Sequence, residues 1–132
     1  MAVTALVINY NAGALLGDCV QSLIDNGVTD VRVVDNASTD GSIDRLRGRF
    51  GRSPTVQVLV NPTNRGFGRA VNDQLAALDR EHLLVINPDC RLEPCAVRTL
   101  EAALQAAPQA GLAGPRVVEA AGRFEPAASR HF

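Results

Sequence analysis

The strongest constraint on the fold is a regular alternation between short apolar runs and longer segments with helical spacing. Four runs rich in Val, Ile and Leu occupy residues 3–8, 31–34, 56–60 and 83–86. Between them, apolar residues recur every three or four positions, which is typical of helices that bury one face. We therefore expect an α/β fold of three layers, an α/β/α sandwich in which helices cover both faces of a mostly parallel sheet.

The last part of the chain continues this pattern less clearly. Pro94 suits the first position of a fourth helix that runs to about Ala107. Residues 112–118 are expected to form a fifth strand, and residues 119–132 an irregular tail. The 132 residues suit one domain, 1–132, and the pattern suggests that a longer domain is cut at its end.

Charge and cysteine content exclude several classes of protein. A net charge of −1 offers no basic surface for nucleic acid. Cys19, Cys90 and Cys95 are odd in number and lack CxxC spacing, which argues against a disulfide framework or a zinc site. The amino terminus lacks the features of a signal peptide, and no apolar run approaches the roughly 20 residues that span a bilayer. The expected location is cytoplasmic, and association of the full-length protein with the membrane periphery is the alternative.

Polar residues gather where each expected strand ends. The four exits read INYN, DNASTDG, NPTNRGFG and NPDC. In open parallel sheets, ligands bind at the carboxyl ends of the strands, so these exits predict one polar binding edge. The alternative is that they only form turns and caps, with Ser38, Thr39 or Asp40 capping the second helix.

Asp35 and Tyr10 are the first candidates at this edge. Asp35 follows a run, residues 31–34, in which three of four residues are apolar, so its carboxylate must find hydrogen-bond donors. A ligand N–H and a backbone amide of the following loop are the two possible partners. Tyr10 either stacks on a base or covers the edge of the sheet.

Asp89 is the candidate metal ligand. It follows the fourth strand and Pro88, and a fixed carboxylate there suits Mg²⁺ or Mn²⁺, which prefer oxygen ligands. The alternative is an ordinary Asn-Pro-Asp turn. Cys90 beside it has no partner Cys or His nearby and is expected to be a packing residue.

Other nucleotide-binding motifs are missing or weak. The chain has no GxxxxGK[ST] loop, and GFGRAV lacks the third glycine of a dinucleotide fingerprint. A sugar nucleotidyltransferase remains an alternative, but NYNAGALL lacks the Gly-rich basic loop expected of one. A non-catalytic nucleotide-binding module is the second alternative.

Taken together, four segments over residues 3–118 resemble family 2 glycosyltransferases of the GT-A fold. They are VTALVINYNAGALLGDCVQSL, VVDNASTDGS, NRGFGRAVN and VINPDC, in the family's order and spacing. The NPD form looks most like the rhamnosyltransferase-type branch. The resemblance implies a Rossmann-like half that binds a nucleotide sugar, such as a dTDP- or UDP-sugar.

The resemblance also implies roles for individual residues near the nucleotide. Tyr10 and Asn11 would border the base, and Asp35 would accept its ring N–H. Arg65 and Gly66, together with Asn72, match the segment that lines the donor pocket, where an arginine can neutralise diphosphate charge.

At the fourth strand, the resemblance implies a divalent cation, Mg²⁺ or Mn²⁺. Asp89 matches the last acidic residue of the family's DxD element, which holds the cation against the two phosphates. Asn87 replaces the first acidic residue, so one carboxylate would address the metal.

The parent protein implied by the resemblance is an inverting glycosyltransferase of polysaccharide biosynthesis with a carbohydrate or lipid-linked acceptor. The family's general base lies in a later half of the domain, so we expect it beyond residue 132 and expect this chain alone to be inactive. An exposed strand edge would also allow a homodimer.

Overall fold

The computed structural model describes residues 2–119 and 121–123. They fall into two compact units, residues 1–94 and residues 95–132, and each unit is described by itself.

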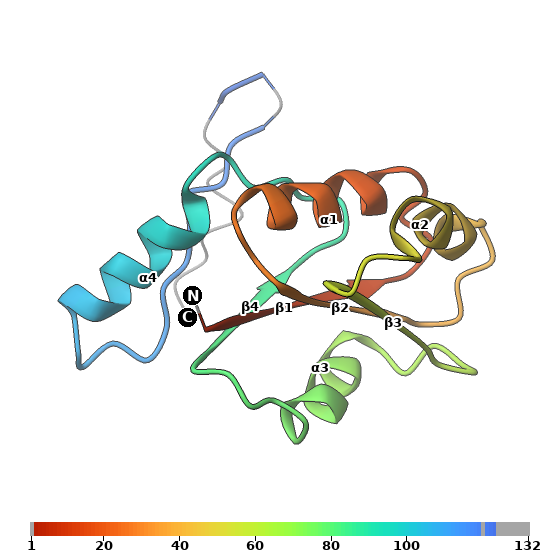
Figure 1. The fold of residues 1–132 in the computed structure, drawn as a ribbon, viewed down its shortest axis with the longest axis horizontal. Helices are drawn as coiled ribbons and strands as arrows, with labels where there is room; N and C mark the ends of the chain where they lie inside the picture. The colour runs from red at the N-terminus through yellow and green to blue at the C-terminus, as the bar shows by residue number, and fades with distance from the viewer. Residues whose placement is uncertain (1, 120, 124–132) are drawn as a thin grey trace. The chain divides into compact units, whose positions relative to one another are not determined.

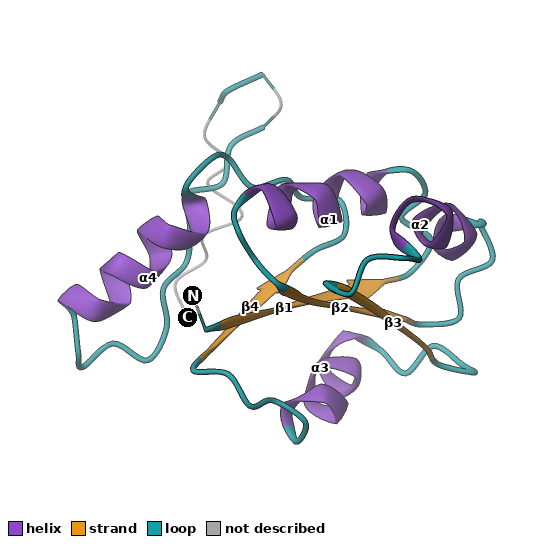
Figure 2. Cartoon of the chain, viewed as in Figure 1, coloured by secondary structure: helices purple, strands orange, loops and turns teal. Residues whose placement is uncertain are grey.

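The first unit contains a four-stranded sheet in the order β3-β2-β1-β4, with every neighbouring pair parallel (Figure 1). Its strands are β1 (Val3–Asn9), β2 (Asp30–Asp35), β3 (Val56–Val60) and β4 (His82–Ile86). Its helices are α1 (Leu15–Asp25), α2 (Ser42–Phe50) and α3 (Phe67–Leu75). Figure 2 shows α1 and α2 over one face of the sheet and α3 over the other. The predicted three-layer α/β/α fold with a parallel sheet is therefore confirmed.

The central strand β1 explains why this sheet forms. All seven of its residues are buried, because helices cover both of its faces. On one face, α1 contributes a stripe of side chains that are fully buried, namely Leu16, Cys19, Val20 and Leu23. The helix ends at Asn26 and Gly27, whose φ of 82° is a left-handed conformation that glycine adopts at low cost.

The opposite face of the sheet packs on α3. The buried cluster there joins two strands to one helix and consists of Leu6, Ile8, Val34 and Ala70, with Val71 and Leu83 packed against it. Leu6 is completely buried in this cluster. The edge strands β3 and β4 are only partly buried, so the core is centred on β1 and β2.

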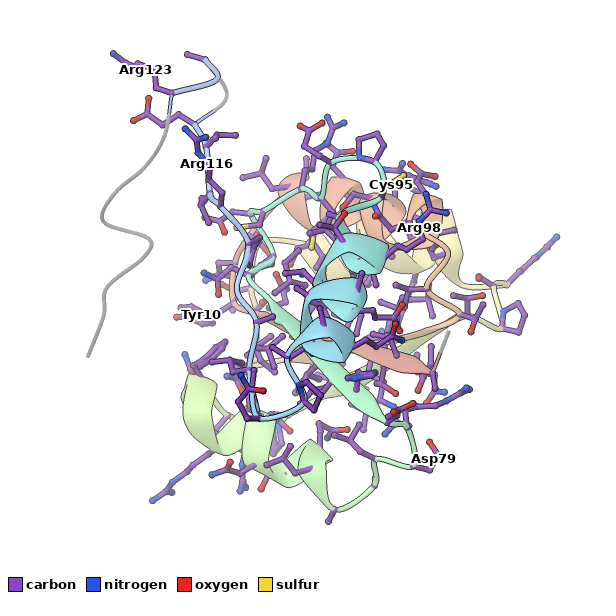
Figure 3. All side chains as sticks on the ribbon, turned by 90° about the vertical axis from the view of Figure 1, so that its left-hand side faces the viewer. Tyr10, Asp79, Cys95, Arg98, Arg116 and Arg123 are labelled. Carbon is purple, nitrogen blue, oxygen red and sulfur yellow. The ribbon has the colours of Figure 1, made fainter. Side chains whose placement is uncertain are left out.

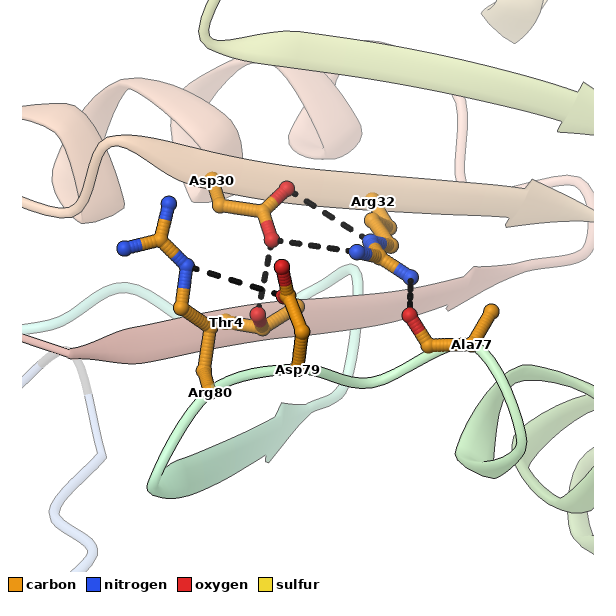
Figure 4. A network of polar contacts seen from close by, with 6 residues as sticks. All are labelled: Thr4, Asp30, Arg32, Ala77, Asp79 and Arg80. Atoms are coloured by element: carbon orange, nitrogen blue, oxygen red, sulfur yellow. Dashed lines mark hydrogen bonds and ion pairs between the residues drawn. The ribbon is translucent and has the colours of Figure 1, made fainter.

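A network of polar contacts around the ion pair of Arg32 and Asp30 connects the segment after α3 to the amino end of the sheet (Figure 4). The Arg32 guanidinium lies 3.3 Å from Asp30 Oδ2, and the two side chains are 13% and 9% exposed. Thr4 Oγ1 donates to the same Asp30 oxygen at 2.7 Å. Arg32 Nη1 donates to the carbonyl of Ala77 at 3.1 Å. These partners satisfy a pair of buried charges that would otherwise destabilise the fold.

The second unit differs from its predicted structure. Helix α4 spans Ala96–Ala106 and begins two residues after Pro94, because Cys95 adopts a left-handed conformation with a φ of 66° at the N-cap. Residues 112–118 form no strand, and only Val118 makes an isolated bridge. Gly114 and Pro115 explain this, since proline lacks the N–H that a sheet ladder requires and glycine weakens a strand. The predicted tail lies mostly outside the described residues.

No helix within the described ranges has the length and apolar character needed to cross a bilayer.

Candidate functional site

The carboxyl edge of the sheet brings the strand exits of the first unit together. Asn9 and Asp35 end β1 and β2 and are directly paired in the parallel register. The chain leaves β1 toward β2 on one side and returns to β4 on the other, so the strand order reverses at β1. This is the place where open α/β sheets bind ligands.

The carboxylate of Asp35 is held by donors from the chain itself. Oδ1 accepts hydrogen bonds from Asn9 Nδ2 at 2.8 Å and from Ser38 Oγ at 2.6 Å. Oδ2 accepts one from the backbone N–H of Ser38 at 3.0 Å. Only 2% of Asp35 is exposed. The backbone amide of the following loop, one of the two partners expected from the sequence, is thus present, and direct contact with a base stays a prediction.

Asn9 and Asn36 organise this edge, although no individual role was predicted for either from the sequence. The Asn9 amide also donates to Ser42 Oγ at 2.9 Å, while its Oδ1 is buried without a hydrogen-bond partner. The Asn36 side chain accepts from Asn61 Nδ2 at 2.9 Å and donates to the Gly66 carbonyl at 3.2 Å. A polar residue that ends an otherwise apolar strand is the sequence signal that points to such roles.

The loop after β1 presents Tyr10 and Asn11. Tyr10 is 55% exposed and lies at the surface (Figure 3), so its ring is accessible to a ligand. Asn11 is joined to the loop after β2 in both directions: its N–H donates to Ser38 Oγ at 2.9 Å, and its Oδ1 accepts from the N–H of Thr39 at 2.8 Å. The two loops form one connected surface.

Asp40 provides a further link between the same loops. Its Oδ2 accepts from the N–H of Gly13 at 2.8 Å, and its Oδ1 accepts from the N–H of Ser42 at 3.0 Å. The hydrogen bonds from the hydroxyl and then the N–H of Ser42 lower the pKa of the Asp40 carboxyl from its ordinary value. Asp40 is therefore ionised at neutral pH. It accepts from the first N–H of α2, although Gly41 and not Asp40 is the N-cap residue of that helix.

The predicted phosphate-binding residues lie around the start of α3. The guanidinium of Arg65 is paired with Asp73, with Nε 2.9 Å from Oδ2, and both side chains remain nearly half exposed. Gly66 precedes the helix with a φ of 79°, which favours glycine. Asn72 is exposed on the helix itself. Since the backbone N–H of Arg65 donates to Asn36 Oδ1 at 3.4 Å, this segment is connected to the end of β2.

The turn after β4 carries the predicted cation ligands. Asn87 and Asp89 are both exposed, and the N–H of Cys90 closes the turn on the Asn87 carbonyl at 3.1 Å. Among the described residues, no group of three or more His, Cys, Asp and Glu side chains is placed to hold a metal ion. One exposed carboxylate and one amide oxygen fit a hard cation only as part of its ligand set, since such ions take about six oxygens. The turn therefore fits a cation that a ligand's oxygens help to coordinate.

Two thiols border this turn. The Sγ of Cys19 on α1 lies 3.5 Å from the Asn87 carbonyl, and burial raises the pKa of Cys19 to about 12, with Cys90 and Asp89 adding to the shift. Burial, followed by the charge of Asp89, raises the pKa of Cys90 as well. Both thiols are thus protonated at neutral pH and are poor metal ligands there.

Comparisons with known proteins converge on one family. A family model described as Glycosyl transferase family 2 matches residues 4–132. An N-acetylglucosaminyl-diphospho-decaprenol L-rhamnosyltransferase of Mycobacterium tuberculosis is 30% identical over 118 residues, which are 81% of this chain and 38% of that protein. The chain thus spans well under half the length of this curated relative.

Solved structures share the fold. One is the mannosyltransferase PcManGT from Pyrobaculum calidifontis, solved with GDP-Man and Mn²⁺, which has a TM-score of 0.70 at 23% sequence identity. The match covers 81% of this chain and 33% of the PcManGT chain. Another is TarS 1-349 from S. aureus, solved with UDP-GlcNAc, which has a TM-score of 0.68 at 22% sequence identity. The match covers 80% of this chain and 32% of the TarS chain.

Proposed function

This chain belongs to glycosyl transferase family 2, and from that premise we propose that the carboxyl edge of its sheet binds the nucleoside diphosphate of a sugar-nucleotide donor. The parent activity that we propose is transfer of the sugar to a hydroxyl acceptor with inversion at the anomeric carbon. The observation that carries the proposal is the connected loop surface after β1 and β2 at the point of strand-order reversal. The turn with the exposed Asp89 follows β4, which is parallel to β1, so it lies at the same edge of the sheet.

The base would bind against the loop after β1. Tyr10 offers an exposed aromatic ring on which a nucleobase can stack, and Asn11 offers its side-chain N–H₂ group. Asp35 Oδ2 accepts one hydrogen bond in the structure, so one lone pair remains for a ring N–H. Since Asp35 is buried, that contact requires the base to reach the floor of the site.

The diphosphate would bind near the start of α3. The Arg65 guanidinium can donate to phosphate oxygens, because only part of its donor set is used by Asp73. Gly66 leaves the backbone open at this point, since nothing lies within 4 Å of where a side chain would begin. Asn72 would add a neutral donor.

Asp89, with Asn87 beside it, would hold a divalent cation such as Mg²⁺ or Mn²⁺. A cation bound there would stabilise the negative charge of the diphosphate leaving group. The presence of Mn²⁺ in the PcManGT structure supports a divalent cation as part of the proposed donor site. The general base is assigned to no residue of this chain.

The relatives suggest substrate classes for the proposed activity. The rhamnosyltransferase relative acts, by its name, on a diphospho-decaprenol-linked sugar, which supports a lipid-linked acceptor and a role in polysaccharide biosynthesis at the membrane surface. The solved neighbours hold UDP-GlcNAc or GDP-Man, which supports a nucleotide-sugar donor. We keep dTDP- and UDP-sugars as the proposed donors.

Calorimetry with uridine, thymidine and guanosine diphosphates, each with and without Mn²⁺, tests the proposal. We expect one nucleotide to bind more tightly than the others and Mn²⁺ to strengthen its binding. Equal, very weak binding of all three with and without the metal would overturn the donor-site assignment. Uridine without phosphate serves as the control, because it lacks the groups that Arg65 and the cation would recognise.

A further inference from the structure

The carboxylate of Asp40 binds a backbone N–H that lies 27 residues earlier in the chain as well as one at the start of α2. One oxygen accepts from Gly13, two residues before α1 begins, at 2.8 Å. The other accepts from Ser42, the first residue of α2, at 3.0 Å. The backbone carbonyl of Asp40 is itself fixed by Arg45 Nη2 at 3.0 Å. A single side chain thus connects the starts of two neighbouring helices.

The connection encloses the loop that carries Tyr10. On one side of Tyr10, Asn9 is fully buried at the end of β1. On the other side, Asn11 has a left-handed φ of 53° and exchanges hydrogen bonds with Ser38 and Thr39. Asp40 then fixes Gly13 at the far end of the loop. The backbone around Tyr10 is therefore held at both ends while its ring remains exposed.

We propose that Asp40 is a positioning residue for nucleotide binding, which holds residues 10–13 in the shape that presents Tyr10 and Asn11 to the donor. This inference rests on the proposed function of the carboxyl edge. A loop that is ordered when the protein folds does not have to be ordered again when the ligand binds, so the ligand binds more tightly. Hydrogen bonds to an ionised acceptor are stronger than neutral ones, which suits a carboxylate for this role.

The closing experiment compares Asp40→Asn with Asp44→Asn. Both changes remove one negative charge near the start of α2, but Asp44 is exposed in the first turn of that helix. In Asp40→Asn an amide NH₂ replaces one oxygen, so one of the two backbone N–H groups loses its acceptor. Nucleotide diphosphate affinity with Mn²⁺ is measured by calorimetry, and amide hydrogen exchange is followed at Gly13.

Asp40→Asn is expected to bind the preferred nucleotide diphosphate about 5- to 10-fold more weakly, because the binding-competent loop is then only fractionally populated. The Gly13 amide is expected to exchange faster. Asp44→Asn is expected to stay within about 2-fold of the parent. A role in stability alone would lower the melting temperature without changing the affinity of the folded protein.

The outcomes separate this inference from the proposed function. A parent chain that binds none of the nucleotide diphosphates overturns both. If the parent binds one of them and a folded Asp40→Asn variant binds it with the same affinity, only the role of Asp40 is overturned. If Asp40→Asn does not fold, Asp40→Ser replaces it, since a short hydroxyl can still accept from the start of α2. Equal affinity in that variant overturns the role of Asp40 in the same way.

Discussion

The side-chain amide of Asn9 donates to Asp35 Oδ1 across 2.8 Å, at the point where the two central strands end side by side. Neither residue is more than 2% exposed. This bond fixes the orientation of a buried carboxylate that also holds the Ser38 turn. It therefore links the core of the sheet to the loops of the candidate site.

Asn9→Ala is expected to destabilise the protein by about 1–3 kcal/mol, because it removes one of the donors to a buried carboxylate. Asn9→Asp, of nearly the same shape, should cost about 3 kcal/mol or more, since it places two carboxylates in contact in a buried site. Urea unfolding at neutral pH measures both changes. Asn72→Asp is the control, because Asn72 is exposed on α3. An Asn9→Asp variant as stable as that control would contradict the structural role of this bond.

Leu6 tests the packing of the core between β1 and α3. It is fully buried, and Leu6→Ala should destabilise the fold by about 2–5 kcal/mol through lost burial and the cavity left behind. Leu15→Ala removes the same atoms from a side chain that is 54% exposed and should change stability by less than about 1 kcal/mol. Denaturant unfolding of both variants gives the comparison. Equal effects would contradict the assigned core.

The buried thiol of Cys19 leads us to expect a loss of stability at alkaline pH. Burial raises the pKa of its thiol in the folded protein from 9.0 to about 12, so folding favours the protonated form. The protonated thiol therefore adds to the free energy of unfolding in full below about pH 9. This stabilisation, up to roughly 4 kcal/mol in total, is lost as the pH rises toward about 12.

The measurement for Cys19 is urea unfolding at pH 8 and at pH 11. The fall in stability between these two values should be smaller in Cys19→Ala than in the parent. Cys95→Ala, which removes an exposed thiol, should lose as much stability between pH 8 and pH 11 as the parent does. If Cys19→Ala loses as much stability as the parent between the two pH values, the raised pKa of Cys19 is wrong.

The layers and most of the elements could be predicted from local patterns. Strand β1 is a run of β-branched and apolar residues that is buried on both faces, and α1 shows its stripe directly in the sequence. The strand predicted for residues 112–118 does not form, because Gly114 and Pro115 interrupt an otherwise mostly apolar run. Periodicity reports which residues can be buried, and a strand also needs a neighbouring strand with which to pair.

The details of the site were less predictable. The sequence indicated that Asp35 needs donors, but Asn9 lies 26 residues away and becomes its partner only when β1 and β2 pair in register. Asp40 was one of three candidate caps for the second helix, but its bond to the N–H of Gly13 depends on the same strand pairing. Tertiary hydrogen bonds of this kind have no local signature in a single sequence.

The position of β4 at the edge of the described sheet leads us to expect self-association. In the described sheet β4 pairs only with β1, and Val85 on β4 is 39% exposed. An open strand edge with apolar side chains can pair with a second copy, most simply as a symmetric dimer. Light scattering should show a dimer at high concentration for the parent and a monomer for Val85→Lys. Leu15→Lys, on α1, should still dimerise, and a monomeric parent would refute the expectation.

Asp89 gives the sharpest test of the proposed donor site. It is exposed and is the only carboxylate of the Asn-Pro-Asp turn, so cation binding should depend on it. One carboxylate supplies one or two of about six oxygen ligands, and the donor diphosphate would supply two more. Metal and nucleotide should therefore bind with positive coupling, typically about 1–3 kcal/mol, or roughly 5- to 150-fold in affinity. In Asp89→Asn we expect an intact fold with this coupling lost.

Calorimetry of uridine or thymidine diphosphate with and without Mn²⁺, on both proteins, measures the coupling. Asp89→Asn keeps the shape of the turn and removes only the charge, so it separates a ligand role from a turn-forming one. Asp79→Asn makes the same change in an exposed carboxylate on the segment between α3 and β4, next to Arg80, and should retain the coupling. If Asp89→Asn keeps the Mn²⁺ enhancement of the parent, then Asp89 is a turn residue and the cation lies elsewhere. If only Asp89→Asn loses it, the turn after β4 is the metal-binding part of the donor site.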